Sequence, residues 1–516
     1  MFALIVLLSC SRQSAPAPTP TPAAVRVYLT SSAGDQMREM GVSEATPAAT
    51  IAILSDQKRQ VFYGVGGSLT QASAAALAEL SPQKRRAVLD AYFGENGARY
   101  GLSRTHIASS DFSESTYTYA PEADPSLSGF SIEADRKNGL LALIKDARAA
   151  PGADFDLIAS PWTAPPWMKD NNQFYDTSAR RGGTLLEEHI ETFANYLVAY
   201  IEAYRAEGIP IWAITPVNEP QGNGGSWESM DMSPVQQRSV VSAISTAFQA
   251  ASLDTRVLIF DQNRKEMDQY TSVILGDPTV APAVFGTAVH WYNSTFRVYE
   301  DVLDAQHAKY PDKVIIQSEG TADSLANPAS CEGVCLSPPC GCEEMYIWWQ
   351  NDPWYWQKDA TDWGWDWAND REVDHPKYAP AMRYARDLVV GTGHWLSGWV
   401  DWNIVLNKRG GPNHVRNFCL APVLVDGETD TVYYTPIFYV LQQFSRFSRP
   451  GGVVVGAAVE GPDGLEATAI ENPDGSTAVH VFNDSGAAVV YQVQLGDRTI
   501  GAEIPNAALQ TIVISP

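Results

Sequence analysis

Basic side chains are scarce in this chain, and their scarcity excludes several kinds of partner. The 516 residues include 36 Lys and Arg against 60 Asp and Glu, so the formal net charge is -24. A surface with this excess of negative charge repels the phosphate backbone of nucleic acids, and it also disfavours anionic substrates. We therefore expect neither nucleic-acid binding nor a strongly acidic substrate.

Long hydrophobic runs are absent as well. The apolar N-terminal stretch, residues 1–10 (MFALIVLLSC), is shorter than the roughly 20 residues that a helix needs to cross a bilayer. It resembles the apolar part of an export signal, and Cys10 resembles the lipidated residue of a bacterial lipoprotein. Because the usual basic start is missing, a truncated start and a chance apolar stretch are the alternatives. We expect an exported protein, either a periplasmic or cell-surface lipoprotein or a secreted one, with residues 1–23 as signal-like segment and Pro-rich tether.

Cysteine is also rare, and four of the six cysteines lie close together. In an oxidising compartment, Cys331, Cys335, Cys340 and Cys342 would form two disulfides, for which three pairings exist. A zinc site is the alternative, but the spacing departs from paired C-x-x-C motifs and no His lies nearby. Cys419 stands alone in an apolar segment and is expected to be a buried free thiol.

Short apolar segments alternate with helix-like segments from about residue 60 to residue 405. This alternation is typical of a parallel sheet with crossover helices. Eight segments have the composition of buried strands: VFYGVGGS, GLSRTHIAS, DFDLIASP, IPIWAITPVNEP, TRVLIFD, GTAVHWY, KVIIQSEG and SGWVDWN. Eight such units in series predict an α/β fold, a (β/α)8 TIM barrel. We assign this catalytic barrel to residues 59–410, with a Cys- and Trp-rich insertion at 321–378.

The two ends of the chain have a different sequence pattern from the predicted barrel segment. Beyond about residue 450, alternating segments such as AVHVFNDSGAAVVYQVQL are separated by the turn signals NPDG and NDSG, which indicates an all-β domain. Residues 24–58 contain two segments of the same pattern, AVRVYLTSS and ATIAILSD. We therefore predict an all-β sandwich side domain, built from residues 411–516 together with N-terminal strands from residues 24–58.

Polar and aromatic side chains recur at or just beyond the carboxyl ends of the predicted strands, which form the active-site rim of a TIM barrel. Two carboxylates, Glu219 after the fourth strand and Glu319 after the seventh, would face each other across the barrel mouth. Glycoside hydrolysis requires such a pair, because one acid protonates the leaving oxygen while the other attacks the anomeric carbon or activates water. The other rim residues are Arg104, Asp111, Trp162, His290 and Trp402.

Eight motifs then follow the order seen in a known family: GGSLTQASAAAL, SDFSESTYTYAP, ASPWTAPPWMK, WAITPVNEP, AVHWY, SEG, GWVDWN and GGPNHVRNF. From about residue 60 to the C-terminus, less a segment after Glu319, the chain resembles the glucosylceramidase-like branch of glycoside hydrolase family 30. The resemblance implies that Glu219 is the acid/base and that Glu319 is the nucleophile. It also implies that the reaction needs neither a metal nor a cofactor.

The resemblance further implies a set of substrate-binding residues. Asn218 matches the residue that binds the sugar 2-hydroxyl, and Arg104 would help to keep Glu319 ionised. Where the family usually has an aromatic residue, this chain has His414. The terminal-sugar pocket and its lining are matched by Asp111, Trp162, His290, Tyr292, Trp402 and Asn417. Without these motifs, both tryptophans would be interpreted as ordinary core aromatics, and His290 as a hydrogen-bonded core imidazole.

The expected activity is that of a retaining β-glycosidase, exo-acting on β-glucosides, oligosaccharides or glycolipids. An endo-β-1,6-glucanase with the same chemistry is one alternative. A non-catalytic carbohydrate-binding protein on a hydrolase scaffold is another, although the presence of both glutamates counts against it. Seven of the fifteen tryptophans fall between Trp348 and Trp367. These either form a disulfide-stapled mini-core or line outer subsites for the substrate.

Overall fold

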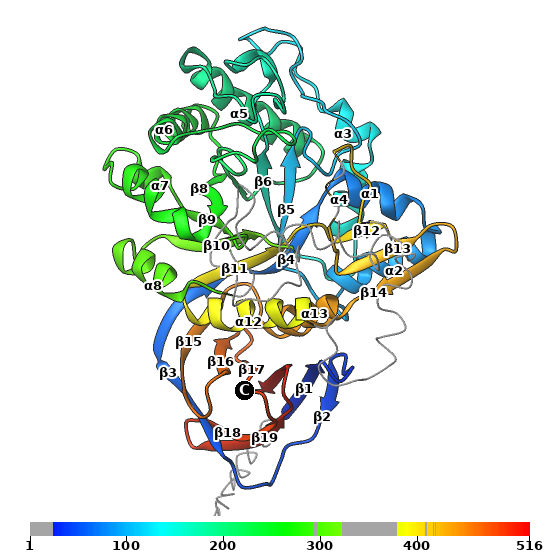
Figure 1. Cartoon of the computed structure of the whole chain (residues 1–516), viewed down its shortest axis with the longest axis vertical. Helices are drawn as coiled ribbons and strands as arrows, with labels where there is room; N and C mark the ends of the chain where they lie inside the picture. The colour runs from blue at the N-terminus through cyan, green and yellow to red at the C-terminus, as the bar shows by residue number, and fades with distance from the viewer. Residues whose placement is uncertain (1–23, 294–296, 322–378, 408–409, 416, 418) are drawn as a thin grey trace, which may run out of the picture.

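The computed structural model describes residues 24–293, 297–321, 379–407, 410–415, 417 and 419–516 (Figure 1). The signal-like segment with Cys10, the cysteine cluster and the Trp-rich segment lie outside the described residues, so their predicted roles stay predictions. Cys419 is buried and is not disulfide-bonded, as predicted. Within the described residues, no helix is both long enough and apolar enough to cross a bilayer.

Eight parallel strands close into a barrel in the predicted order, and each of them contains part of one predicted strand segment. The predicted TIM barrel is therefore confirmed. Around the barrel the strands are β4 (Gly64–Leu69), β5 (Leu102–Ile107), β6 (Asp156–Pro161), β7 (Ala213–Ile214), β8 (Arg256–Asn263), β9 (Gly286–His290), β10 (Val314–Glu319) and β11 (Leu396–Asp401).

Strand β7 is only two residues long, although the apolar segment around it is much longer. Pro210 and Pro216 flank it, and neither can donate a backbone hydrogen bond to a neighbouring strand. The chain therefore leaves the barrel early and enters the loop that contains Glu219. The other barrel strands, none of which has a proline on both sides within three residues, run for five to eight residues.

Helices surround the barrel, and their buried faces follow the spacing expected from the sequence (Figure 1). In α5, for example, Phe193, Leu197, Ile201 and Tyr204 recur every three or four residues and are all buried. The helices are α1 (Gln71–Ala78), α2 (Pro82–Phe93), α3 (Glu133–Lys137), α4 (Leu140–Arg148), α5 (Ile190–Ala206), α6 (Pro234–Ala250), α7 (Met267–Ile274), α8 (Glu300–Lys309), α12 (Ala379–Gly393) and α13 (Pro436–Phe447). Short 3₁₀ turns lie at Pro166–Met168, Glu187–His189, Arg264–Glu266 and Ala281–Ala283.

The β domain is a nine-stranded sheet that combines both ends of the chain. Its strands, in spatial order, are β19 (Arg498–Ile504), β18 (Val489–Leu495), β3 (Ala49–Phe62), β15 (Gly452–Glu460), β16 (Leu465–Glu471), β17 (Thr477–Asn483), β20 (Ala508–Ile514), β1 (Val25–Ser31) and β2 (Arg38–Met40). Strand β3 lies between β18 and β15, and β1 pairs with β20. The prediction that N-terminal strands complete the C-terminal sheet is thus confirmed.

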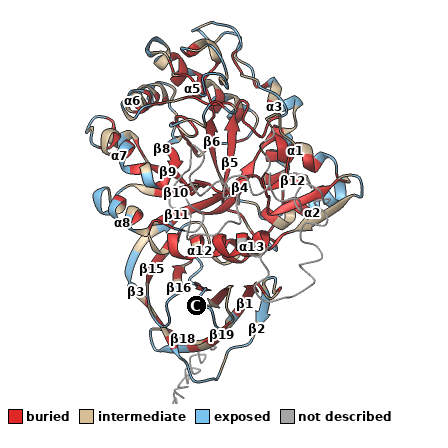
Figure 2. Ribbon diagram, viewed as in Figure 1, coloured by how far each residue is buried: buried red, intermediate tan, exposed pale blue. Residues whose placement is uncertain are grey.

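Residues 411–451 differ from the predicted β domain, because they lie outside the nine-stranded sheet. Strands β12 (Val405–Asn407), β13 (Val423–Asp426) and β14 (Thr431–Tyr434) form a separate three-stranded sheet, whose alternating sequence resembles that of the β domain. Helix α13 follows and lies with α12 between the barrel and the β domain, where both helices are largely buried (Figure 2). Within α13, Gln443 donates hydrogen bonds to Leu509 O and Thr511 Oγ1 of the β domain.

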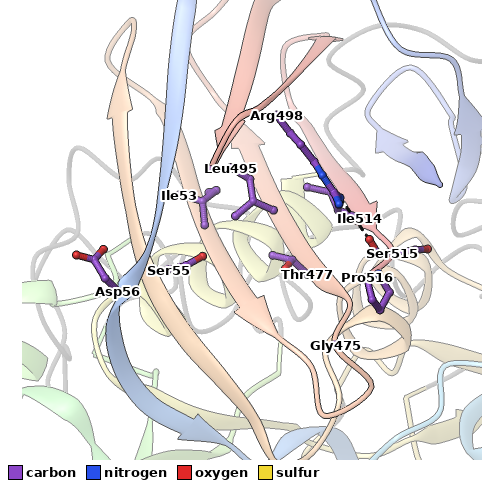
Figure 3. A pocket seen from close by; sticks show the side chains of 11 residues that line it. Ile53, Ser55, Asp56, Gly475, Thr477, Leu495, Arg498, Ile514, Ser515 and Pro516 are labelled. Atoms are coloured by element: carbon purple, nitrogen blue, oxygen red, sulfur yellow. Dashed lines mark hydrogen bonds between the residues drawn. The ribbon is translucent and has the colours of Figure 1, made fainter. Parts of the chain in front are cut away.

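A hollow of about 490 Å³ opens in the β domain, away from the barrel mouth (Figure 3). Its lining includes one acid, Asp56, and one base, Arg498, but no aromatic side chain. It therefore offers neither a stacking surface for a sugar ring nor a pair of carboxylates. The chemistry expected from the sequence must lie at the barrel.

Candidate active site

The ten predicted site residues all lie at one end of the barrel, on the strand ends or on the loops that follow them. The strands themselves carry Arg104 in β5, His290 in β9 and Glu319 in β10. The loops carry Asp111, Trp162, Asn218, Glu219, Tyr292, Trp402 and Asn417. Contacts join eight of these residues into one cluster, and Asp111 and Asn417 contact each other.

Glu319 ends strand β10 and is held by two donors. Arg104 Nη1 donates to one carboxylate oxygen at 2.5 Å, and Tyr292 Oη donates to the other at 3.0 Å. The Glu319 side chain is only 7% exposed. Both oxygens are therefore fixed in direction, which suits a group that must attack from one side.

Glu219 lies in the loop after β7, with its backbone in the left-handed region at φ 49°. This conformation costs roughly 1–2 kcal/mol for a residue other than glycine. Two hydrogen bonds hold the loop against neighbouring strands: Glu219 N–H donates to Asp261 O at 2.9 Å, and Asn218 N–H donates to Pro161 O at 2.7 Å. The Glu219 side chain is 17% exposed and lies 3.3 Å from His290 Nδ1. It is thus more open to an incoming water than Glu319 is.

The two glutamates are close together. One ligand atom each of Glu219, His290 and Glu319 lies within 4.8 Å of the other two. Carboxylates of retaining glycosidases are about 5 Å apart, whereas those of inverting enzymes are roughly 6.5–9.5 Å apart. The observed spacing therefore matches the retaining geometry.

The same three groups are of the kinds that bind metal ions, but their charges disfavour a metal here. Arg104 already neutralises Glu319. Burial lowers the pKa of His290, but the charge of Glu319 and hydrogen bonds with Asp261 and Glu219 outweigh burial and raise that pKa to about 9. A metal requires the neutral imidazole, so a protonated His290 is a poor ligand.

Asp261 connects the two halves of the catalytic centre and was missed by the sequence analysis. It lies in β8 and accepts hydrogen bonds from Arg104 at 2.7 Å and from His290 Nε2 at 3.0 Å. Its other donors are Ser318, Thr215 and Ser160. The signal that marked Glu319, an acid at the end of an apolar strand, is also present in the segment VLIFD.

The charges of Arg104, His290 and Asp261 are balanced when one further carboxylate in this cluster is ionised. Burial raises the pKa of Asp261, but Arg104 and His290 outweigh burial and hold that pKa well below its usual range. Burial raises the pKa of Glu319 above its ordinary value, and His290 and Arg104 oppose this rise. With two cations and ionised Asp261, the cluster is neutral when one of the two glutamates is ionised, and the donors Arg104 and Tyr292 favour the ionised form of Glu319. This is the division of charge that a nucleophile and an acid require.

Trp162 and Trp402 form a wall beside the catalytic centre. Their ring centroids are 5.1 Å apart and their planes are inclined by 25°. Arg104 Cζ lies 4.9 Å from the Trp162 ring centroid, so the wall continues directly from the residue that holds Glu319. Both tryptophans are buried, yet their contact with Arg104 places them at the site rather than in a separate core.

Asp111 and Asn417 come from loops that are far apart in sequence. Asn417 Nδ2 donates to Asp111 Oδ2 at 2.7 Å, whereas Asp111 Oδ1 has no hydrogen-bond partner among the described residues. Burial raises the pKa of Asp111 well above its ordinary value, and the charge of Glu319 adds to the rise. Asp111 is thus a buried acid with one oxygen available to a sugar hydroxyl.

A second buried acid, Glu228, lies near Asp111 and has no sequence motif that would have identified it. Its charge adds to the rise in the pKa of Asp111. Glu228 Oε2 lies 3.3 Å from His414 Nε2. The residue that departs from the family pattern therefore contacts an acid near the sugar-binding residues.

Two protein-family models match this chain. The model described as "Glycosyl hydrolase family 30 TIM-barrel domain" matches residues 62–331 and 360–448. The model described as "Glycosyl hydrolase family 30 beta sandwich domain" matches residues 451–512. The first model alone matches more than half of the chain.

Known proteins give a consistent result. Lysosomal acid glucosylceramidase of Mus musculus is 30% identical over 450 residues, which cover 85% of this chain and 79% of that protein. Endo-1,6-beta-D-glucanase neg1 of Aspergillus fumigatus is 25% identical, with coverage of 81% and 76%. Among solved structures, SrfJ from Salmonella typhimurium has a TM-score of 0.80 at 23% identity, covering 95% of this chain and 99% of that one. On this sequence and structural similarity, the chain belongs to glycosyl hydrolase family 30 and is a glycoside hydrolase.

Proposed function

We propose that this chain is a retaining β-glucosidase that removes terminal glucose by double displacement. The observation that carries the proposal is the placement of Glu219 and Glu319 within 4.8 Å, with Glu319 held by Arg104 and Tyr292. An acid fixed by two donors is suited to attack. An acid with more exposure and a single His contact is suited to exchange protons with a leaving group and with water.

In the first step, a Glu319 oxygen forms a bond to the anomeric carbon while the bond to the leaving oxygen breaks. Glu219 gives its proton to that oxygen, so the aglycone departs as a neutral alcohol. In the second step, Glu219 takes a proton from water, and the resulting hydroxide replaces Glu319 at the anomeric carbon. Two inversions leave the product with the starting configuration.

The surroundings of the pair support an exo action. Trp162 and Trp402 form the wall beside the catalytic centre. Asp111 is held by Asn417 and keeps one oxygen free. Such an arrangement holds the hydroxyls and one face of a single terminal ring. The printed name of the mouse relative adds glucosylceramide to the substrates worth testing.

An endo-β-1,6-glucanase is the second candidate. The fungal relative with that printed name covers 81% of this chain, so the same scaffold accommodates internal cleavage of a polymer. The two candidates differ in the length of the first product. Exo action releases glucose from the start, whereas endo action releases a range of oligosaccharides.

Two measurements test the proposal. Proton NMR of freshly released product should show the β-anomer first, and α-anomer first would contradict retention. A panel of an aryl β-glucoside, gentio-oligosaccharides, a β-1,6-glucan and glucosylceramide should yield glucose as the first product. Oligosaccharides as first products would favour the second candidate, and the absence of any cleavage would favour a carbohydrate-binding protein.

Export and lipid attachment at Cys10 form a separate part of the proposal. They follow from the N-terminal sequence and are independent of the catalytic chemistry. Labelling expressing cells with a radioactive fatty acid should mark the wild type but not a Cys10→Ala variant. Equal absence of label in both proteins would contradict the anchor.

A further inference from the structure

The loop 411–417, which follows strand β12, is closed on itself. Asn413 Nδ2 donates to Asn417 O at 2.9 Å, and Asn417 N–H donates back to Asn413 Oδ1 at 3.0 Å. These two hydrogen bonds tie Asn413 directly to Asn417. His414 lies inside this closed loop, and Asn417 at its end donates to Asp111.

His414 docks this loop on the loop after β5. Its backbone N–H donates to Ser113 O at 3.0 Å, and its ring Nδ1 lies 2.8 Å from the same oxygen. Ser113 belongs to the turn that carries Asp111, because its Oγ accepts from Ser110 N–H at 3.0 Å. The two loops are thus joined at two points, Asn417 with Asp111 and His414 with Ser113.

The loop after β7 contributes Glu228, whose side chain lies beside His414. Its backbone is anchored, since Asn223 Nδ2 donates to Glu228 O at 3.2 Å and Lys169 Nζ donates to Ser229 O at 2.9 Å. The Glu228 side chain is fully buried. Among the described residues neither of its oxygens accepts an aligned hydrogen bond, and His414 Nε2 lies 3.3 Å from Glu228 Oε2.

We infer that His414 and Glu228 form a buried charge pair that positions Asp111 and Asn417 for the terminal sugar, and that the pair weakens when His414 loses its proton. The inference rests on the proposed function, because it assigns a terminal-sugar pocket to Asp111 and Asn417. His414 acts here as a positioning residue, since it reaches the pocket through its neighbours. An aromatic residue at this position could pack against the loop but could not carry charge.

The titration of His414 has a definite direction. Burial lowers its pKa, but the neighbouring Glu228 carboxylate, 3.3 Å away, outweighs burial and raises that pKa above the ordinary value. The pairing is therefore complete at acidic pH and is lost as the pH rises through the raised pKa. Asp111 also faces His414, and Asp111, His106, Lys169 and Tyr175 are titratable groups that interact with Glu228.

Kinetics of three variants test the inference. His414→Gln keeps a donor but cannot be charged, and His414→Ala removes both. The control is His394→Gln, which alters an exposed His–Asp304 pair at the opposite end of the barrel. With an aryl β-glucoside at pH about 6, both His414 variants should raise KM about tenfold and change kcat by about twofold or less. In the wild type KM should rise with pH, whereas in His414→Gln it should be nearly independent of pH.

A second measurement does not require turnover. The imidazole signal of His414, identified by its loss in His414→Gln, should titrate above the ordinary histidine pKa in wild-type protein. In Glu228→Gln it should titrate at lower pH, because the opposing charge has gone. An unchanged pKa of His414 would overturn the inference, as would a lowered melting temperature with KM unchanged. A wild type that shifts as expected but cleaves no glucoside would instead refute the proposed function alone.

Discussion

The two halves of the active site rest on different supports. Arg104, Asp261, His290 and Glu319 lie within barrel strands, whose backbones are hydrogen-bonded to neighbours on both sides. Asp111 and the other residues that would hold the sugar lie on loops, tied together by a few side-chain hydrogen bonds. Loops change more readily than strands do. Glu219 also lies on a loop, but its backbone N–H is hydrogen-bonded to Asp261 O of β8. The strands therefore fix the nucleophile and the charges around it, whereas the residues that would select the substrate lie on loops that can change independently.

The largest effect should follow from the glutamates themselves. Glu319→Gln should abolish turnover, because every substrate needs the nucleophile. Glu219→Gln should slow the first step about 10²–10⁴-fold, and less for aryl glucosides that leave without protonation. The measurement is steady-state kinetics with aryl and alkyl glucosides.

Azide distinguishes the two roles. Glu219→Ala with azide should give a glycosyl azide of retained configuration, since the covalent intermediate still forms. Glu319→Ala with azide should give the inverted product. The opposite pairing of products would reverse the assignment of the two glutamates.

Next in size should be the loss of Asp261. Asp261→Asn removes the charge shared by Arg104 and His290, so kcat/KM should fall about 10²–10³-fold. The pKa of His290 should fall as well, which moves the alkaline limb of the rate profile to lower pH. The matched control is Asp135→Asn, a buried acid hydrogen-bonded to Tyr117, Tyr119 and Tyr204 away from the site.

Both variants should lower the melting temperature, but only Asp261→Asn should lower kcat/KM. Equal kinetic effects in the two proteins would show that any buried acid matters alike. In that case the kinetic effect of Asp261→Asn could not be assigned to the contacts of Asp261 with Arg104 and His290.

A smaller effect should appear in stability as a function of pH. The pKa of His290 is raised to about 9, so the stability it contributes is complete below its ordinary value near 6.5 and is lost as the pH rises through about 9. The difference corresponds to about 3 kcal/mol in the free energy of unfolding. Thermal unfolding of wild type and His290→Gln should therefore converge at alkaline pH. A constant difference between them would contradict a charged His290.

The smallest effect should come from the loop side. Asn417→Ala removes one neutral donor from Asp111, and a single hydrogen bond of this kind is worth about 0.5–1.5 kcal/mol. KM for an aryl glucoside should rise about 2–13-fold with kcat nearly unchanged. A fall in kcat as large as that of Asp261→Asn would remove the distinction between the two supports.

Much of this architecture could be predicted because it follows from local patterns. Apolar segments with polar ends identified all eight strands, and the alternation near residues 24–58 identified the N-terminal part of the β domain. The central role of Asp261 could not be predicted, since its partners come from four other strands and sequence spacing gives no distances. Glu228 was missed because it lies in a loop without periodicity. Residues 423–434 were placed in the wrong sheet because short alternating strands look alike.

The pairing of β1 with β20 also has a consequence in time. Val25 and its partner Ile514 lie 489 residues apart along the chain. At roughly 5–20 residues per second, ribosomes take about half a minute or more to produce the partner. Throughout that interval one edge of β1 lacks its partner, and unpaired edges readily associate with other strands. The newly made chain must therefore be shielded from its neighbours until its final strand emerges.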